Sequence, residues 1–370
     1  EKFDYNGTEY TYPDIDLIYW AGGNPFHHHQ NLARLRKAWE KPSTVIVNEW
    51  CWNALARHAD IILPCTTTLE RQDIGMTPRD PFVISMDKAI EPIGEARNDY
   101  DIFAGIARNM DTEDAFTEGR SAEEWQRWIW EQSRERAAKL NVQMPDYQSF
   151  RETGFYKSPE LNEDRIFLSD FFNDPDTNPL KTPSGKIELF SKTIDSFNYD
   201  NCPGHPTWME PAEWLGAKDK TYPLHVISNQ PKTKLHSQMD NGALSSSIKI
   251  KGHQPLEMNP VDAKARGITE GDIVRVFNGR GACLCGVNIA SDVMPGVVII
   301  STGSWYDPVD PADPSSMCKH GNPNVLSPDI GTSKLAQGPA AHSCLAEIEL
   351  YDGPAQNITA FNPPEIIDKK

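Results

Sequence analysis

The chain has 370 residues, which is too long for one compact hydrophobic core and predicts two or three domains. Its net charge of −17 argues against nucleic acid or an anionic membrane surface as the main partner. No apolar run approaches the length of a membrane span, and the seven cysteines are too scattered for a disulfide framework. We therefore expect no nucleic-acid partner and no membrane span. An anionic ligand would need basic groups or hydrogen-bond donors at its site, because the chain as a whole is negatively charged.

The first part of the chain alternates strand and helix patterns. Apolar runs predict strands at residues 17–21, 44–48 and 59–63. Helices are expected between them, at residues 32–39 and 54–58. Near-continuous apolar strands separated by helices are typical of a parallel sheet that is covered on both faces. The expected fold class is therefore α/β, beginning with a parallel-sheet dinucleotide-binding domain over residues 1–110.

One turn in this region predicts a ligand. The first strand is expected to be buried, and it ends in Gly22, Gly23, Asn24 and Pro25, which predict a tight turn into a helix. Glycines at such a turn let backbone N–H groups approach a phosphate, and a helix N-terminus adds the positive end of its dipole. The turn favours a nucleotide-like cofactor, but two glycines are common in α/β loops, so it does not identify the ligand alone.

Residues 111–220 predict a helical and irregular connecting segment. Helical spacing begins near residue 97, and Ser121 and Glu124 have capping-box spacing ahead of a further helix. Residues 141–220 are rich in Pro, Asp, Asn and aromatic residues, with a strand-like run at residues 186–190. Because the aromatic content argues against disorder, we expect a long ordered connection.

Residues 221–370 predict mainly β-structure. Strands are expected at residues 224–228, 272–277, 282–289 and 297–300. The second and third form a hairpin around Asn278 and Gly279. Asn259 and Pro260 begin a small helix that ends at Gly267. Short strands with tight turns favour a closed barrel. Cys283 and Cys285 share one face of a strand, and we interpret them as packing residues.

Four ordered groups of residues resemble the dimethyl sulfoxide reductase family of molybdenum enzymes. They are residues 19–30, 56–71, 228–238 and 320–338. The motifs Ser228-Asn-Gln-Pro and His320-Gly-Asn-Pro-Asn favour the biotin sulfoxide and trimethylamine N-oxide reductase branch. The resemblance covers essentially the whole chain and implies the C-terminal half of such an enzyme. It also implies a C-terminal molybdopterin dinucleotide-binding barrel.

The resemblance implies molybdenum bis(molybdopterin guanine dinucleotide) as the cofactor. Backbone groups of Gly22, Gly23 and Asn24 can bind its pyrophosphate. The guanine needs an acceptor such as Glu49 or Asp60, and the pterin edges need amides, hydroxyls and imidazoles. The further residues implied are Trp20, His27, Gln30, Asn48, Arg57, Ser228, Gln230, Lys234, Leu235, His236, Ser237, Gln238, Asn324, Gln337 and Gly338. Lys234 stands where an arginine is expected in many relatives, so that one contact is in doubt. The front turn and the tail loops are expected to converge on this ligand.

The implied reaction removes an oxygen atom from a small S- or N-oxide. In the family a serine of the N-terminal half binds molybdenum, and no segment here matches it, so we name neither a metal ligand nor a catalytic residue. The electron donor is unknown, and location in the cytoplasm or the periplasm stays undecided. Alternatives are a formate dehydrogenase or nitrate reductase branch, or a non-catalytic dinucleotide-binding module. An NAD-dependent dehydrogenase is disfavoured because Gly-x-Gly-x-x-Gly is lacking.

Two local patterns have less favoured functional interpretations. Consecutive histidines, His27 to His29, point in different directions on a loop, which disfavours one shared metal ion. His236 and Ser237 lack an acid that would orient them as a nucleophilic pair, which disfavours a hydrolase.

Overall fold

The computed structural model describes residues 1–159 and 166–367. The chain divides into two compact units. Unit 1 comprises Glu1–Ile46, Trp52–Asp60 and Leu189–Lys370. Unit 2 comprises Val47–Cys51 and Ile61–Glu188.

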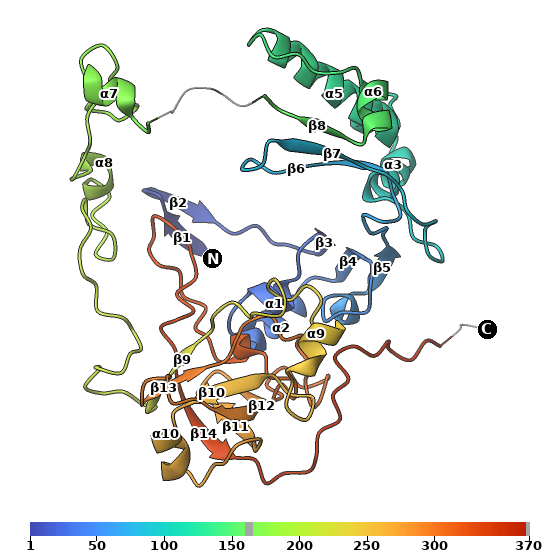
Figure 1. Cartoon of the computed structure of the whole chain (residues 1–370). Helices are drawn as coiled ribbons and strands as arrows, with labels where there is room; N and C mark the ends of the chain where they lie inside the picture. The colour runs from blue at the N-terminus through green and yellow to red at the C-terminus, as the bar shows by residue number, and fades with distance from the viewer. Residues whose placement is uncertain (160–165, 368–370) are drawn as a thin grey trace. The chain divides into compact units, whose positions relative to one another are not determined.

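A closed six-stranded barrel lies in unit 1 (Figure 1). Its strands, in order around the barrel, are β10 (Pro255–Met258), β12 (Ala282–Ile289), β11 (Ile273–Phe277), β14 (Leu345–Leu350), β9 (Leu224–Ile227) and β13 (Val297–Ile299). The pairs β10–β12 and β13–β9 are parallel, and the other pairs are antiparallel. The side chains of Val274, Leu284 and Val298 are fully buried. Closure leaves the barrel without a free strand edge.

The prediction of a barrel built around a hairpin is confirmed. Strands β11 and β12 pair from Ile273 with Gly286 to Phe277 with Ala282. Asn278 closes the turn, since its N–H donates to the Gly281 carbonyl over 3.0 Å. The packing role of Cys283 and Cys285 is also confirmed, because both are fully buried and their sulfur atoms lie 4.0 Å apart. Strands β10 and β14, which complete the barrel, were not predicted.

Short elements surround the barrel in unit 1. Helix α10 (Pro260–Ala265) begins as predicted, with the Asn259 side chain accepting from the Val261 N–H over 2.9 Å. The remaining elements are the hairpin β1 (Lys2–Tyr5) and β2 (Thr8–Thr11), and the helices α1 (Pro25–His28), α2 (Leu32–Trp39), η1 (Ala56–His58), α8 (Lys192–Asp195), α9 (Ala243–Ser247) and η2 (Pro323–Val325).

A three-stranded sheet contains the predicted strands of the first region. Its order is β3 (Leu17–Ala21), β4 (Thr44–Glu49) and β5 (Ile61–Pro64). The prediction that the first strand is buried is wrong, because β3 lies at the sheet edge and Leu17 is 53% exposed. The central strand β4 buries Val45 and Val47 instead.

The helix predictions of this region need two corrections. The helix predicted at residues 32–39 is confirmed as α2, but the turn at Gly22 leads first into α1, a separate helix of four residues. Such a short helix has little dipole, so the predicted contribution of a helix N-terminus does not apply here. The helix expected at residues 54–58 is a 3-10 turn, η1, because only three of its residues continue the helical hydrogen bonding.

Unit 2 has its own antiparallel sheet and a small aromatic core. The sheet order is β6 (Asp73–Met76), β7 (Phe82–Met86) and β8 (Phe155–Lys157), and none of these strands was predicted. The helices are α3 (Asp99–Asn109), α4 (Glu113–Thr117), α5 (Ala122–Ala138), α6 (Tyr147–Thr153) and α7 (Ser169–Asn173). The rings of Trp130 and Phe150 stack with centroids 3.8 Å apart. The capping box of Ser121 and Glu124 is confirmed.

The strand expected at residues 186–190 is wrong. Ile187 is 65% exposed and Leu189 is 83% exposed, and neither residue lies in a strand. Alternating apolar residues form a strand only where a neighbouring strand supplies backbone partners. Across residues 1–159 and 166–367, none of the helices combines the length and the apolar character that crossing a bilayer requires.

Candidate functional site

The turn after β3 presents polar atoms that have no protein partner. Gly22 and Gly23 have φ values of 85° and 76°, a left-handed conformation that favours glycine. Asn24 caps α1, with its Oδ1 accepting from the Phe26 N–H over 3.1 Å. Within the described residues, Trp20 Nε1, Asn24 Nδ2 and His27 Nε2 are buried and unpartnered. Buried polar groups normally have a partner, so these three atoms point to a ligand.

The loop around η2 holds this turn from a distant part of the sequence. Asn322 Nδ2 donates to the Phe26 carbonyl, and Asn324 Nδ2 donates to the His27 carbonyl, each over 3.0 Å. Asn322 Oδ1 also accepts from the Asn324 N–H over 2.9 Å. Both asparagines are buried. The expected convergence of the front turn with a tail loop is therefore present within unit 1.

His27 is a neutral imidazole at this junction. Its side chain stacks on Trp305, with ring centroids 5.7 Å apart. Burial lowers the pKa of His27 to about 3. The buried ring can therefore exchange a hydrogen bond with a ligand through Nε2 without carrying a charge at neutral pH.

A cavity of about 560 Å³ lies between the end of α1, helix α2 and residues 329–339. Its polar lining includes His28, Gln30, Arg34, Asp329 and Gln337. The volume suits a small-molecule or cofactor fragment. Two of the predicted contact residues, Gln30 and Gln337, thus share one cavity. Amide, imidazole and guanidinium groups in this lining match the hydrogen-bonding edges of a purine or pterin.

The loop from Lys234 to Asp240 carries five further predicted residues, of which Lys234 is described below with Asp240. Leu235 is 61% exposed, Gln238 is exposed, and Ser237 accepts from Trp305 Nε1 through its carbonyl over 2.9 Å. His236 has a φ of 50°, and its Nδ1 lies 2.8 Å from Gln230 Nε2.

Gly303 lies against this loop. A Cβ at Gly303 would come 1.8 Å from the His236 carbonyl oxygen, so only glycine fits there. The conformation of the loop and the absence of a side chain at residue 303 are therefore coupled.

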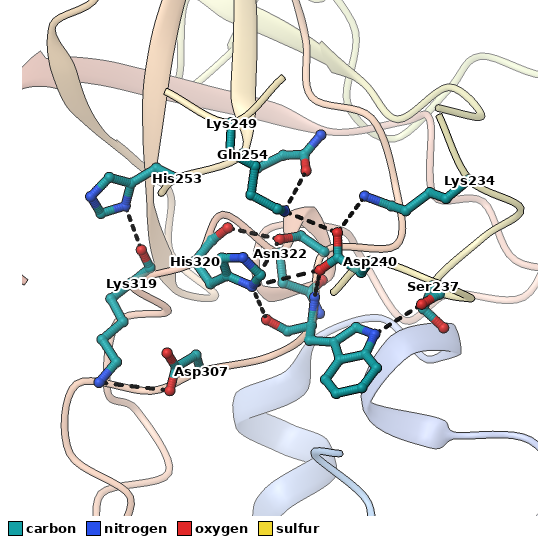
Figure 2. A network of polar contacts seen from close by, with 12 residues as sticks. Lys234, Ser237, Asp240, Lys249, His253, Gln254, Asp307, Lys319, His320 and Asn322 are labelled. Carbon is teal, nitrogen blue, oxygen red and sulfur yellow. Dashed lines mark hydrogen bonds and ion pairs between the residues drawn. The ribbon is translucent and has the colours of Figure 1, made fainter. Parts of the chain in front are cut away.

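A buried charge cluster, which we call the Asp240 cluster, comprises Asp240, Lys234 and Lys249 (Figure 2). Asp240 Oδ1 accepts from Lys234 Nζ over 2.7 Å and pairs with Lys249 Nζ over 2.9 Å. Its Oδ2 accepts from the Trp305 N–H over 3.0 Å. Burial alone would raise the pKa of Asp240, but the charges around it, led by Lys249, outweigh burial and lower the pKa to about 2.

His320 lies beside the Asp240 cluster as a second neutral histidine. Its Nδ1 is 2.9 Å from the Trp305 carbonyl, and because a carbonyl only accepts, Nδ1 carries the proton. Burial, followed by the charge of Lys249, lowers the pKa of His320 to about 3. Its Nε2 is a buried acceptor without a partner among the residues described.

The other predicted residues have identifiable surroundings. Arg57 donates to the carbonyls of Thr359 and Asn362, and the Asp60 carboxylate accepts from the Val45 N–H over 2.8 Å. Ser228 Oγ is buried without a partner, in the part of the chain that the structure describes. The Gly338 carbonyl accepts from the Thr332 N–H over 2.8 Å.

Asn48 and Glu49 belong to unit 2. Asn48 Nδ2 donates to Asp99 Oδ1 over 2.8 Å. Glu49 Oε1 accepts from the Trp50 N–H over 3.0 Å.

Sequence reasoning missed Asp240, Lys249 and Trp305. Trp305 lies outside the four groups of residues that carry the family resemblance. A single aspartate such as Asp240 forms no recognisable motif by itself. Only the six-residue spacing of Lys234 and Asp240 could have suggested an ion pair. In residues 1–159 and 166–367, no three His, Cys, Asp or Glu side chains are arranged to hold a metal ion.

Comparisons with known proteins match both ends of the chain. Residues 7–109 match the family described as Molybdopterin oxidoreductase, and residues 224–345 match the family described as Molydopterin dinucleotide binding domain. The dimethyl sulfoxide/trimethylamine N-oxide reductase of Cereibacter sphaeroides is 47% identical, over 98% of this chain and 45% of its own length. The biotin sulfoxide reductase of the same organism is 44% identical, over 95% of this chain and 47% of its own length.

A third relative and one solved structure agree with these matches. The trimethylamine-N-oxide reductase of Haemophilus influenzae is 41% identical, over 99% of this chain and 45% of its own length. The chain thus spans less than half the length of these relatives. Acetylene hydratase from Pelobacter acetylenicus has a similar fold, with a TM-score of 0.69 at 19% identity over 91% of this chain and 44% of that one.

Proposed function

Because the chain belongs to the dimethyl sulfoxide reductase family of molybdopterin oxidoreductases, we propose that it forms part of an enzyme that reduces S-oxides or N-oxides. The proposed cofactor is molybdenum bis(molybdopterin guanine dinucleotide). The observation that carries the proposal is the set of unpartnered buried atoms at the turn, Trp20 Nε1, Asn24 Nδ2 and His27 Nε2. They lie within the residues matched to the oxidoreductase family.

The residues present fit such a cofactor. Trp20 Nε1 and Asn24 Nδ2 are donors that suit phosphate or pterin oxygens. A Cβ at Gly22 would have no atom within 4 Å, so the backbone there is open to close approach by a ligand. The cavity between α2 and residues 329–339 adds Gln30 and Gln337. An acidic chain gains from such neutral and cationic donors when it binds a polyanion.

The cofactor, when bound, supplies the two-electron chemistry that removes oxygen from the substrate, and the chain's residues bind and orient it. His27 stays uncharged and offers Nε2 to the ligand. Asn322 and Asn324 fix the main chain under His27, so that this hydrogen bond has a defined direction. The Trp305 ring stacks on the His27 imidazole and restricts its orientation.

The proposed contact set keeps the residues inferred from the sequence. Those with open polar atoms or cavity surface are Trp20, Gly22, Gly23, Asn24, His27, Gln30, Ser228 and Gln337. Asn324 and Lys234 are proposed to act through other residues, because their polar atoms already have protein partners. We also propose a parallel-sheet domain at residues 1–110, a connecting segment at 111–220 and a dinucleotide-binding barrel domain at 221–370, in keeping with the matched ranges 7–109 and 224–345.

The test is to express the complete reading frame that contains these residues and to measure three properties. These are bound molybdenum, guanine nucleotide released by acid, and reduction of dimethyl sulfoxide, trimethylamine N-oxide and biotin sulfoxide by a reduced viologen. Trp20→Phe should lower cofactor content, because it removes Nε1 while keeping a ring against Trp39. Trp208→Phe, at a side chain 75% exposed, is the matched control. Folded protein without molybdenum, guanine and activity would contradict the proposal.

A further inference from the structure

The Asp240 cluster is buried and yet has a net positive charge. Two ammonium groups share one carboxylate, which leaves one positive charge in excess. The exposed fractions of the side chains are 0% for Asp240, 1% for Lys234 and 5% for Lys249. Burying a charge without a counter-charge is unfavourable. A chain that keeps a surplus buried cation next to a ligand site therefore has a use for that charge.

Nearby polar groups leave this surplus in place. Lys249 Nζ also lies 3.3 Å from the Gln254 amide oxygen, which is neutral. His320 contacts the cluster through Nδ1, which lies 3.8 Å from Asp240 Oδ2, and stays uncharged at neutral pH. Burial lowers the pKa of Lys249 below its ordinary value, and the opposing effect of Asp240 offsets only part of that change. Lys234 Nζ and Lys249 Nζ lie 2.7 Å and 2.9 Å from Asp240 Oδ1, which are the distances of charge-assisted contacts.

The cluster is connected to the ligand site by hydrogen bonds and ring contacts. Asp240 Oδ2 fixes the Trp305 main chain, and the Trp305 ring binds the Ser237 carbonyl and stacks on His27. Figure 2 shows Asp240 between the two lysines, with Ser237 on the same side as Lys234. Asp240 thus connects the loop from Lys234 to Asp240 with Trp305, whose ring stacks on His27 of the front segment.

We propose that Asp240 is a positioning residue of the ligand site, because it fixes Trp305 and the loop from Lys234 to Asp240. Asp240 also leaves the positive charge of Lys249 in surplus, and this charge attracts an anionic ligand group bound beside His27. The inference rests on the proposed function for the identity of that group, a phosphate-bearing guanine dinucleotide. Lys234 and Lys249 are too buried to touch the ligand, so they act through the electric field and through the loop.

Hydrogen exchange of the full chain tests the positioning role. Asp240→Asn keeps the shape but removes the charge, and amide exchange should rise about tenfold in residues 234–240 and 24–28, because the two lysines then repel each other. Asp307→Asn is the matched control, because Asp307 is 2% exposed and has its own partners, Thr359 and Lys319. It should loosen only the chain near Asp307 and Thr359. The same exchange pattern in both variants would overturn the positioning role.

Binding of GDP tests the surplus charge. Lys249→Met should weaken GDP binding about tenfold, and Asp240→Asn with Lys249→Met should restore the affinity, because the double variant has the wild-type cluster charge. The double variant would not regain GDP affinity if the Asp240 carboxylate had only a structural role. Unchanged affinity in Lys249→Met would overturn the electrostatic role. A wild-type chain that binds no GDP would contradict the proposed function and the ligand part of this inference, while the exchange experiment would still judge the positioning role.

Discussion

The front turn and the loop from Lys234 to Asp240 use their polar groups in opposite ways. The turn leaves Trp20 Nε1, Asn24 Nδ2 and His27 Nε2 without protein partners. The loop ends in Asp240, whose two carboxylate oxygens are bound by Lys234, Lys249 and the Trp305 main chain. Open atoms identify the surface that meets a ligand, and satisfied atoms identify the scaffold that holds it. The proposed site therefore divides into a contacting part and a positioning part, which the sequence motifs alone do not separate.

The largest expected effect tests the rigidity of the scaffold. Gly303→Ala should destabilise the protein by about 3 kcal/mol or more, because the new Cβ meets the His236 carbonyl and φ is 89°. Gly267→Ala is the control, since it has φ of 66° but no atom within 4 Å, and should cost about 1 kcal/mol. Urea denaturation measures both. Equal losses would mean that the loop yields easily and is not a scaffold.

The second prediction concerns the ties between the two regions. Asn322→Ala should lower the free energy of unfolding by about 2–3 kcal/mol, because it breaks a buried bond to the Phe26 carbonyl and the cap of Asn324. Asn324→Ala, which removes one side-chain bond to the His27 carbonyl, should cost about 1–2 kcal/mol. Asn109→Ala should change little, since that exposed amide binds only its own helix. Urea denaturation of the three variants gives the order of their losses in the free energy of unfolding. If Asn322→Ala costs as little as Asn109→Ala, the loop around η2 does not stabilise the front turn.

Elements that depend on local residues were predictable from the sequence, whereas the pairing and burial of strands in the sheets were not. The hairpin of β11 and β12 and the capping box at Ser121 follow from local chemistry, so the sequence predicts them correctly. Burial of Leu17 and a strand at residues 186–190 depend on which neighbours a segment finds, and both predictions are wrong. Strand β8 pairs with β7 through residues more than 70 positions apart, such as Phe82 and Lys157, which no local pattern specifies.

In the proposed site, the local conformation of the front turn was predictable from the sequence. Gly22, Gly23 and Asn24 follow from turn chemistry, and their φ values and cap agree with it. Lys234 was inferred as a contact, whereas the structure pairs its ammonium group with Asp240. The partner of a buried charge lies elsewhere in the sequence, so motif reasoning assigns the residue without revealing what it binds.

The pH dependence of stability probes the open turn through its histidine. The folded pKa values of His27 and His320 are lowered to about 3 and that of His58 to about 4, from 6.5. Between pH 5 and 6 the unfolded chain therefore binds more protons than the folded chain, so stability falls as the pH falls, by about 1.2 kcal/mol per pH unit for each such histidine.

His27→Gln should reduce that slope by the contribution of one histidine. Urea denaturation at pH 5.0, 5.5 and 6.0 measures it, a range in which Asp240, with a pKa of about 2, does not titrate. His29→Gln, at an exposed residue, serves as the control for replacing a neighbouring histidine by glutamine. A slope unaffected by His27→Gln would show that the ring is hydrated, and the turn would lose its role as a dry contact surface.

The smallest effect on stability is expected at the cavity wall. Arg34 pairs with Asp329 over 2.6 Å, but its side chain is 74% exposed, so Arg34→Gln should change the free energy of unfolding by less than about 1 kcal/mol. The same change should weaken GDP binding about threefold at low salt and less at high salt, because Arg34 lines the cavity and screening removes its attraction. Lys2→Gln removes an equal charge from the exposed Lys2–Glu9 pair and should leave binding unchanged. If Lys2→Gln weakens GDP binding as much as Arg34→Gln does, only net charge matters, and the cavity has no specific part in holding the ligand.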